Sequence, residues 1–234
     1  MEDSTSQSRI ALLAAYGIMD TPEEQAFDDI TQIAATICQT EISLVSLLDD
    51  KRQWFKSHHG IDACQTPIEQ AFCAHAIRAC DLLIVEDAQQ DERFRHNPLV
   101  TGEPFIRFYA GSPLVTPQGV AIGTLCVIDR EPKQLDNAQK EMLAALGRQV
   151  VDQLELRLYV QKLTAALVEK DAALKEVQEL RAILPICSYC LKIRDDGDFW
   201  HQVDHYLQHH AGIEFSHGIC PECLEGEKSK AREE

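Results

Sequence analysis

The chain has 234 residues, of which 45% are hydrophobic and 26% charged, and its formal net charge is −16. This composition is typical of a folded protein, and the length suits one ordinary domain with an appendage or two small domains. The acidic balance disfavours partners that present phosphate groups, so we expect neither nucleic-acid binding nor docking on an anionic membrane.

The first region, residues 1–137, mixes predicted helices and strands. A helix is expected up to Cys38, with Thr21 as its N-cap and Glu24 as the acid of a capping box. Strands are predicted in "EISLVSLLDD", "RQWFKSHHG", "DLLIVED", "FIRFYAGSPLV" and "VAIGTLCVID", and a short helix in "PIEQAFCAHAIRAC". This order of elements predicts an α+β fold with a largely antiparallel sheet.

Five separated blocks of this region closely resemble bacterial GAF sensor domains of the kind found beside histidine kinases and diguanylate cyclases. The blocks are "ALLAAYGIMDTPEEQAFDDIT", "ISLVSLLDDKRQWFKSHHG", "FCAHAI", "DERFRHNPLVTGEPFIRFYAGSPL" and "GVAIGTLCVIDREP". The resemblance covers residues 8 to 155 and implies a six-stranded antiparallel sheet with helices behind it and a ligand-sized pocket in front. It also implies sensing or dimerisation, but it does not name a ligand. The pattern of cyclic-nucleotide-binding relatives is not recognisable, which disfavours cyclic GMP and cyclic AMP.

Several side chains of this region are candidates for the pocket wall. They are Trp54, Phe55, His75, Arg107, Tyr109 and Cys126. Trp54 and Phe55 are neighbours on a predicted strand, so their side chains point to opposite sides of the sheet. Arg107 and Tyr109 lie two residues apart, so they share one side. Packing in the core is the alternative role for these side chains.

No catalytic motif is recognised in the chain. A Gly-rich phosphate loop, a nucleophile elbow and a His-Glu-x-x-His pair are not found. We therefore expect that the protein is not an enzyme. The alternative is a thiol-redox sensor or a reductase on the GAF scaffold, which would need exposed thiols of low pKa. Cys64, Cys73, Cys80 and Cys126 do not match the arrangement of the methionine-sulfoxide reductases that share this scaffold.

Residues 138–184 predict one long helix, because they contain no proline and a single glycine, and Pro185 follows them. Apolar residues recur at alternating steps of four and three, as in a coiled coil. This seam consists of Leu156, Val160, Leu163, Leu167, Lys170, Leu174 and Val177. Gln153 falls on the seam where an apolar residue is expected, which indicates a stutter in the register. We predict a homodimer through residues 142–184, and the alternative is a helix packed on its own domain.

The segment 185–225 contains two Cys-x-x-Cys pairs, Cys187 with Cys190 and Cys220 with Cys223. Four thiolates in two such pairs suit a tetrahedral zinc ion. A segment this short and this poor in apolar residues could hardly fold without an added cross-link. We therefore predict a structural Zn²⁺ bound by the four cysteines, with His217 as the substitute for one thiolate.

Two further interpretations of these cysteines differ in the neighbours that they require. A c-type haem site would need a histidine directly after the second cysteine, where Leu191 and Leu224 stand. A thiol-based redox switch would use the same four cysteines and stays open as an alternative. The segment also resembles a small cysteine-rich module that follows a coiled coil in bacterial GAF and response-regulator proteins. Residues 226–234 are expected to be a charged, disordered tail.

Together these features predict a signal-transduction sensor. Its GAF domain would sense a small ligand or mediate dimerisation, and the coiled coil would couple that domain to the zinc module. The module would then bind another signalling protein. Nine cysteines, an odd number, without an export signal predict reduced thiols, and no apolar run is long enough to span a membrane. The expected location is therefore the cytoplasm.

Overall fold

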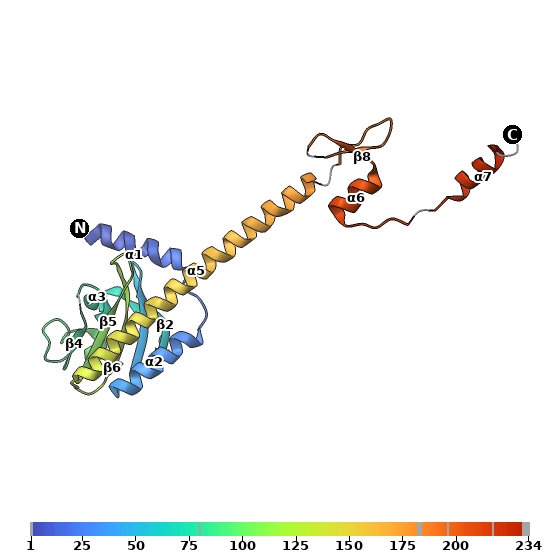
Figure 1. The fold of residues 1–234 in the computed structure, drawn as a ribbon. Coiled ribbons are helices and arrows are strands. Elements are labelled where there is room, and N and C mark those ends of the chain that lie inside the picture. The colour runs from blue at the N-terminus through green and yellow to red at the C-terminus, as the bar shows by residue number, and fades with distance from the viewer. Residues whose placement is uncertain (1, 80, 182–183, 196, 217, 231–234) are drawn as a thin grey trace. The chain divides into compact units, whose positions relative to one another are not determined.

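The computed structural model describes residues 2–79, 81–181, 184–195, 197–216 and 218–230 (Figure 1). The chain divides into two compact units, which comprise Met1–Ala165 and Ala166–Glu234. Helix α5, Asn137–Arg181, begins in the first unit and ends in the second.

A six-stranded antiparallel sheet forms the centre of the first unit, with the strand order β3-β2-β1-β6-β5-β4. The strands are β1 (Ile42–Leu48), β2 (Arg52–His59), β3 (Gln65–Pro67), β4 (Leu83–Val85), β5 (Phe108–Val115) and β6 (Ala121–Asp129). The α+β fold and the antiparallel sheet that the sequence predicts are therefore confirmed.

Two tight turns fix the register of the long strands. Between β1 and β2, the carboxylate of Asp49 accepts the backbone N–H groups of Lys51 and Arg52 at 2.8 and 2.7 Å. Between β5 and β6, Gly119 has a φ of 77°, a conformation that a residue with a side chain rarely adopts. Asp and Gly supply the local chemistry that such turns need.

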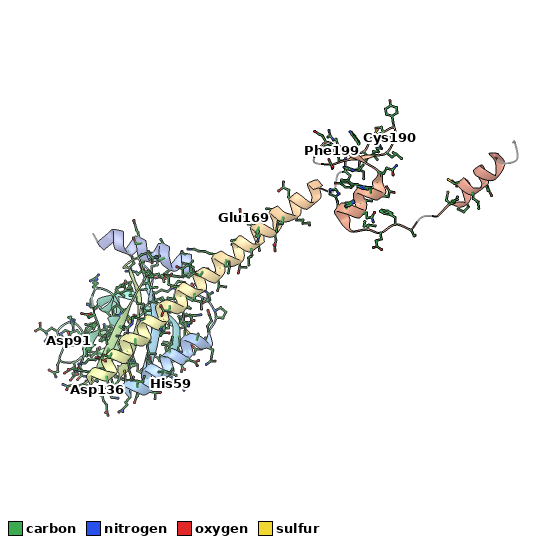
Figure 2. The ribbon with its side chains drawn as sticks, viewed as in Figure 1. His59, Asp91, Asp136, Glu169, Cys190 and Phe199 are labelled. Carbon is green, nitrogen blue, oxygen red and sulfur yellow. The ribbon has the colours of Figure 1, made fainter. Side chains whose placement is uncertain are left out.

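Helices cover both faces of the sheet (Figure 1). They are α1 (Glu2–Tyr16), α2 (Gln25–Cys38), α3 (Phe72–Ala76), α4 (Pro98–Thr101) and α5, with a 3₁₀ turn at Ile68–Gln70. α1, α2 and the first part of α5 contribute side chains to one core cluster, which includes Trp54. α3 and α4 contribute to a second cluster on the other face, which includes Phe55. Side chains fill both layers densely (Figure 2).

The start of α2 differs from the sequence prediction. The helix begins at Gln25, and its N-cap residue Glu24 makes no capping hydrogen bond with its side chain. Thr21 instead donates its hydroxyl to the carbonyl of Ile18 at 2.7 Å. The predicted N-cap at Thr21 is wrong because Glu24 is held by two basic side chains from other elements, Lys56 and Arg157.

Helix α5 has 45 residues and two different parts. In the first part Leu143, Val150 and Leu154 are buried against the core of the unit. Farther along, the predicted seam residues with described side chains are exposed: Leu156, Val160, Leu163, Leu167, Lys170 and Leu174. An α-helix turns by about 100° per residue, so the seam from Leu156 onward faces away from the buried stripe that ends at Leu154. The stutter at Gln153 lies where the apolar stripe changes sides.

The described helices do not include a membrane span. Although α5 is long, neither it nor any other helix in the described ranges combines enough length with enough apolar character to cross a membrane.

Besides the end of α5, the second unit is built from short elements. They are a two-stranded sheet of β7 (Ile193–Arg194) and β8 (Trp200–His201), helix α6 (Val203–Ala211) and helix α7 (Pro221–Lys230). Residues 226–230, expected in a disordered tail, belong to α7. Glu222 in the first turn of α7 favours a helix here, because a negative charge stabilises the N-terminal end of the helix dipole. Residues 231–234 lie outside the described residues.

Candidate functional site

A small cavity lies on the sheet face that carries α3 and α4. Its volume is about 40 Å³, and its mouth is partly open. The lining residues are Ile42, Leu44, Gln53, Phe55, Ile61, Thr66, Ala71, Phe72, Cys73, Leu99, Pro104, Ile106, Tyr109 and Ile128. One water molecule needs roughly 10–15 Å³ of such space, so the cavity suits a very small molecule. Sites for drug-sized ligands measure roughly 300–1,000 Å³.

Two polar atoms in the cavity wall lack a protein partner among the described residues. They are the side-chain oxygens Oε1 of Gln53 and Oγ1 of Thr66, both buried. The two residues face each other across strands β2 and β3. A buried polar group without a hydrogen bond costs about 1–3 kcal/mol. The pair is therefore the part of the wall with the greatest need for a polar partner.

Phe72 and Tyr109, which line the cavity, belong to a cluster of aromatic rings. The rings of Phe72 and Phe94 stack with 4.0 Å between centroids, and Tyr109 lies 5.2 Å from Phe72. His75 meets the Phe94 ring edge-on at 4.9 Å. Burial, followed by the charges of Arg78 and Arg93, lowers the pKa of His75. Its imidazole is therefore favoured in the neutral form.

Two cysteines meet beside this aromatic wall. Cys73 of α3 and Cys126 of β6 are both buried, and their sulfur atoms lie 3.9 Å apart. The hydroxyls of Ser46 and Tyr109 donate to the Cys73 sulfur at 3.2 and 3.3 Å. Thr124 extends the polar group through a 2.9 Å contact with Ser46. Cys73 also lines the cavity, so the thiol group and the cavity are continuous.

The environment separates the two thiols. Burial raises the pKa of Cys73, but its hydrogen bonds with Cys126, Ser46, Thr124 and Tyr109 outweigh burial and lower it overall. The contact with Cys73 and burial raise the pKa of Cys126 well above its usual value. Because the hydroxyls of Ser46 and Tyr109 both donate to its sulfur, Cys73 is the better thiolate of the pair.

The predicted pocket residues take different places. Phe55 and Tyr109 line the cavity, whereas Trp54 lies in the core of the opposite face. Arg107 forms a two-point ion pair with Asp87 at 2.9 and 2.8 Å. His75 lies against Phe94, and Cys126 lies behind Cys73; neither they nor Arg107 are among the residues that line the cavity.

Sequence reasoning missed three polar or thiol residues of the wall: Gln53, Thr66 and Cys73. Gln53 could have been found, because it lies two residues before Phe55 on the same strand face. No pattern in the sequence indicates Thr66, because three residues, the length of its strand β3, are too few to show a period. The sequence does not indicate the pairing of Cys73, because its neighbour Cys126 is 53 positions away.

Behind the sheet, a buried lysine connects β2 to α5. Alternation along β2 places Lys56 on the same sheet face as Trp54, toward the start of α2, where its Nζ binds Glu24 at 2.7 Å and the Thr21 hydroxyl at 2.9 Å. Arg157 of α5 binds the same Glu24 carboxylate oxygen at 2.7 Å. Burial alone would raise the pKa of Glu24, but Lys56 and Arg157 outweigh burial and lower it. One strand thus contacts both the cavity and the helix.

In the second unit each Cys-x-x-Cys pair forms a compact turn. The N–H of Cys187 donates to the carbonyl of Lys192 at 2.9 Å, and Leu191 adopts a left-handed φ of 58°. In the other pair, the N–H of Cys223 donates to the Cys220 sulfur at 3.4 Å. Cys190 lies in the loop before β7 (Figure 2).

Both turns favour thiolates, which zinc requires. Backbone N–H groups, first that of Cys190, lower the pKa of Cys187, and backbone N–H groups, first that of Cys223, lower the pKa of Cys220. Each pair therefore fits half of a four-thiolate site. No group of three or more potential ligands gathers at one point in the described ranges, and His217 lies outside them.

The comparisons with known proteins place residues 22–154, more than half of the chain, under the sequence pattern of the GAF domain. A cyclic di-GMP phosphodiesterase of Pseudomonas aeruginosa is 42% identical over 161 residues, which are 67% of this chain and 27% of that protein. The chain thus spans about a quarter of the curated relative that it matches. The prediction that the chain is not an enzyme is contradicted by this relative, which is named as one. The lack of a recognised catalytic motif was insufficient evidence for that prediction.

Solved structures with a similar backbone are more divergent in sequence. The GAF domain of an Acinetobacter phosphoenolpyruvate-protein phosphotransferase is 17% identical, covering 66% of this chain and 93% of its own, with a TM-score of 0.49. The free methionine-R-sulfoxide reductase of Neisseria meningitidis is 14% identical, covering 64% and 89%, also with a TM-score of 0.49.

Proposed function

Because the chain belongs to the GAF domain family, we propose that it is a signal-transduction protein whose first unit senses a small molecule. The observation that carries this proposal is the cavity with its two unpartnered oxygens. Gln53 Oε1 accepts hydrogen bonds, so the ligand must donate one, while most of the remaining wall is apolar. The expected ligand is therefore small and mostly apolar, with an N–H or O–H group.

A binding test follows directly from this wall. In NMR titrations of the full chain with acetamide and 2-propanol, signals of Phe55 and Tyr109 should shift. The shifts should be lost in Gln53→Leu, which keeps the volume but removes the acceptor. Gln90→Leu, an exposed control, should bind as the wild type does. Equal binding by Gln53→Leu would show that this oxygen does not recognise the ligand.

Strand β2 provides the proposed route from the cavity to α5. Gln53 and Phe55 face the cavity, and the next residue, Lys56, holds the Glu24 carboxylate that also binds Arg157. A ligand changes the position of α5 only if it binds one arrangement more tightly than the other. We therefore propose that the contacts of Glu24 differ between the ligand-bound and ligand-free states.

The output of this change is the proposed homodimer through residues 142–184. The stripe from Leu156 to Leu174 is apolar at five positions and exposed, which suits a second copy of the same helix. The domain-facing stripe cannot serve this role, because Leu143, Val150 and Leu154 are already buried. The dimer contact therefore concentrates beyond Leu154.

Light scattering of the full chain over a range of concentrations tests the dimer. Leu163→Glu places a charge in the stripe and should lower the dimer fraction strongly. Val168→Glu is the matched control, because Val168 is equally exposed but lies about 140° around the helix from Leu163. A wild-type mass that stays monomeric at every concentration would overturn the dimer.

For the second unit we propose one structural Zn²⁺ held by the four cysteines. The preformed turns and their thiolate-stabilising N–H groups support this site. The unit also exposes large side chains, among them Tyr189, Phe199 and Ile219. Exposed aromatic and aliphatic groups of this kind suit a protein-binding surface, so another signalling protein is the proposed partner.

A second proposal comes from the name of the phosphodiesterase relative. Its 42% identity over 161 residues favours a role for this chain in the turnover of cyclic di-GMP. The cavity is too small for a cyclic dinucleotide, so that nucleotide is not its proposed ligand. Cyclic di-GMP should change in cells that express the chain, and the change should be smaller with Leu163→Glu. Unchanged nucleotide levels would contradict this role.

A further inference from the structure

The buried thiols beside the cavity have a chemistry that reversible ligand binding does not use. Cys73 and Cys126 belong to different elements, yet their sulfur atoms are 3.9 Å apart. The other described cysteine in the core, Cys38, lies in the cluster on the opposite sheet face, and burial raises its pKa to about 11. Among the described side chains, the first unit therefore contains one close pair of buried thiols and one buried thiol apart from them.

We propose that Cys73 and Cys126 are a peroxide-sensitive dithiol, which hydrogen peroxide entering the cavity converts into a disulfide. Its chemistry does not depend on the proposed ligand or on the dimer. Its consequence for signalling rests on the proposed sensory function, because Cys73 is part of the cavity wall.

Access distinguishes the two sulfurs. Cys73 lines the cavity, whereas Cys126 lies in the central strand β6 and does not. A volume of about 40 Å³ accommodates hydrogen peroxide, which is little larger than water. It does not accommodate glutathione disulfide. The cavity therefore selects the smallest oxidants and presents them to Cys73 first.

The surrounding hydroxyls favour the attack by Cys73. Ser46 and Tyr109 both donate hydrogen bonds to its sulfur, which stabilises the thiolate that reacts with peroxide. The ring of Tyr109 lies over Gly111, where a Cβ atom would meet the Tyr109 hydroxyl at 2.2 Å. The missing side chain of Gly111 is thus a condition for this hydrogen bond. The lowered pKa of Cys73 agrees with the geometry.

The reaction has two balanced steps. The Cys73 thiolate attacks one peroxide oxygen, the O–O bond breaks, and the departing hydroxide takes up the thiol proton to give water and a sulfenic acid. The Cys126 thiol then attacks the Cys73 sulfur, and the S–OH group leaves as a second water. The two thiols lose two electrons and two protons, and one peroxide is reduced to two waters.

The geometry allows the second step after a modest movement. A disulfide requires about 2.0 Å between sulfurs, so they must approach by roughly 2 Å. Cys126 is fixed in the middle of the sheet, between β1 and β5. α3 has five residues and is followed by a turn, so Cys73 is the side that moves. Its movement would separate it from Tyr109 and reshape the cavity wall.

Peptide mass spectrometry of the full chain tests the proposal. The reduced protein is treated with hydrogen peroxide, its remaining thiols are alkylated under denaturing conditions, and it is digested. A linked peptide containing Cys73 and Cys126 should appear, whereas Cys38 should be alkylated. In Cys126→Ser, a sulfenic-acid reagent such as dimedone should label Cys73. In Tyr109→Phe, the linked peptide should form more slowly, by about tenfold, because one donor to the thiolate is lost.

Oxidant size provides an independent measurement on the wild-type chain. Cumene hydroperoxide should react with the pair more slowly than hydrogen peroxide, and glutathione disulfide should leave it reduced. The proposal is overturned if Cys73 and Cys126 remain as fully alkylated as Cys38, or if they oxidise at the same rate with all three oxidants. If the chain is monomeric and still forms the disulfide, the proposed dimer is wrong and the proposed dithiol stands.

Discussion

The two units of the chain are each stabilised internally by different forces. The first buries apolar side chains on both faces of its sheet, such as Leu47, Leu125 and Leu154. In the second, Ile193 is the one described side chain that is buried. Ordering a residue costs about 1–2 kcal/mol of backbone entropy, which so small a core cannot offset. The comparison indicates that the second unit needs an added link, and two thiolate-favouring turns are the groups that could supply it.

Removing the proposed zinc ion should give the largest effect. One zinc per chain is expected by elemental analysis, and it should be lost in Cys187→Ser, while Cys64→Ser, an exposed thiol of the first unit, should retain it. Structural zinc contributes roughly 10 kcal/mol or more to such small units. A chelator should therefore remove hydrogen-exchange protection from β7, β8 and α6 while leaving the first unit protected. Full protection of these elements without zinc would show that they fold unaided.

The next effect separates the two parts of α5. Leu154→Ala deletes a buried side chain and should lower the free energy of unfolding of the first unit by about 2–5 kcal/mol. Leu163→Ala, on the exposed stripe, should change it by less than about 0.5 kcal/mol at concentrations where the chain is monomeric. Urea denaturation followed by circular dichroism measures both. Equal effects would mean that the stripe is also packed within one chain.

A smaller effect is expected from the ion pairs that hold α5 to β2. Glu24→Gln keeps the shape but weakens two hydrogen bonds between charged groups, so about 1–2 kcal/mol should be lost at neutral pH. The pKa of Glu24 is lower in the folded state than in the unfolded one. Its stabilisation is thus fully present above the unfolded pKa and is lost as the pH falls through the folded pKa.

Acid titration of stability distinguishes this contribution from a shape effect. In urea denaturation at stepwise lower pH, the difference between wild type and Glu24→Gln should begin to shrink below about pH 4.3, the usual pKa of an unfolded Glu, and should shrink further as Glu24 is protonated in the folded state. Asp49 and Asp129 also have lowered pKa values, so their contributions to stability should still be lost in acid in both proteins. A difference that is constant from pH 7 to pH 3 would contradict the ionic role of Glu24.

The sequence predicted the parts of this fold that local patterns encode. The strands around Trp54 and Cys126 and the long helix have clear periodicity or composition, and they form as predicted. The predicted start of α2 was wrong because Glu24, the expected capping acid, instead binds Arg157, which lies 133 positions away. The meeting of Cys73 with Cys126 is likewise set by tertiary packing. Contacts between distant elements leave no periodic trace in one sequence.

The smallest effect is expected in the cavity wall of the first unit, where side-chain oxygens of Gln53 and Thr66 have no partner among the described residues. Gln53→Leu should raise the free energy of unfolding of the ligand-free protein by about 0.5–1 kcal/mol, because an unsatisfied buried oxygen is replaced by an apolar group of similar size. Gln139→Leu is the opposite control, since its amide donates to the carbonyl of Ile37 at 2.9 Å, and it should be destabilising. Thermal unfolding measures both changes. A destabilised Gln53→Leu would mean that the amide is needed by the fold, whereas a gain in stability would indicate that this oxygen is kept for a ligand.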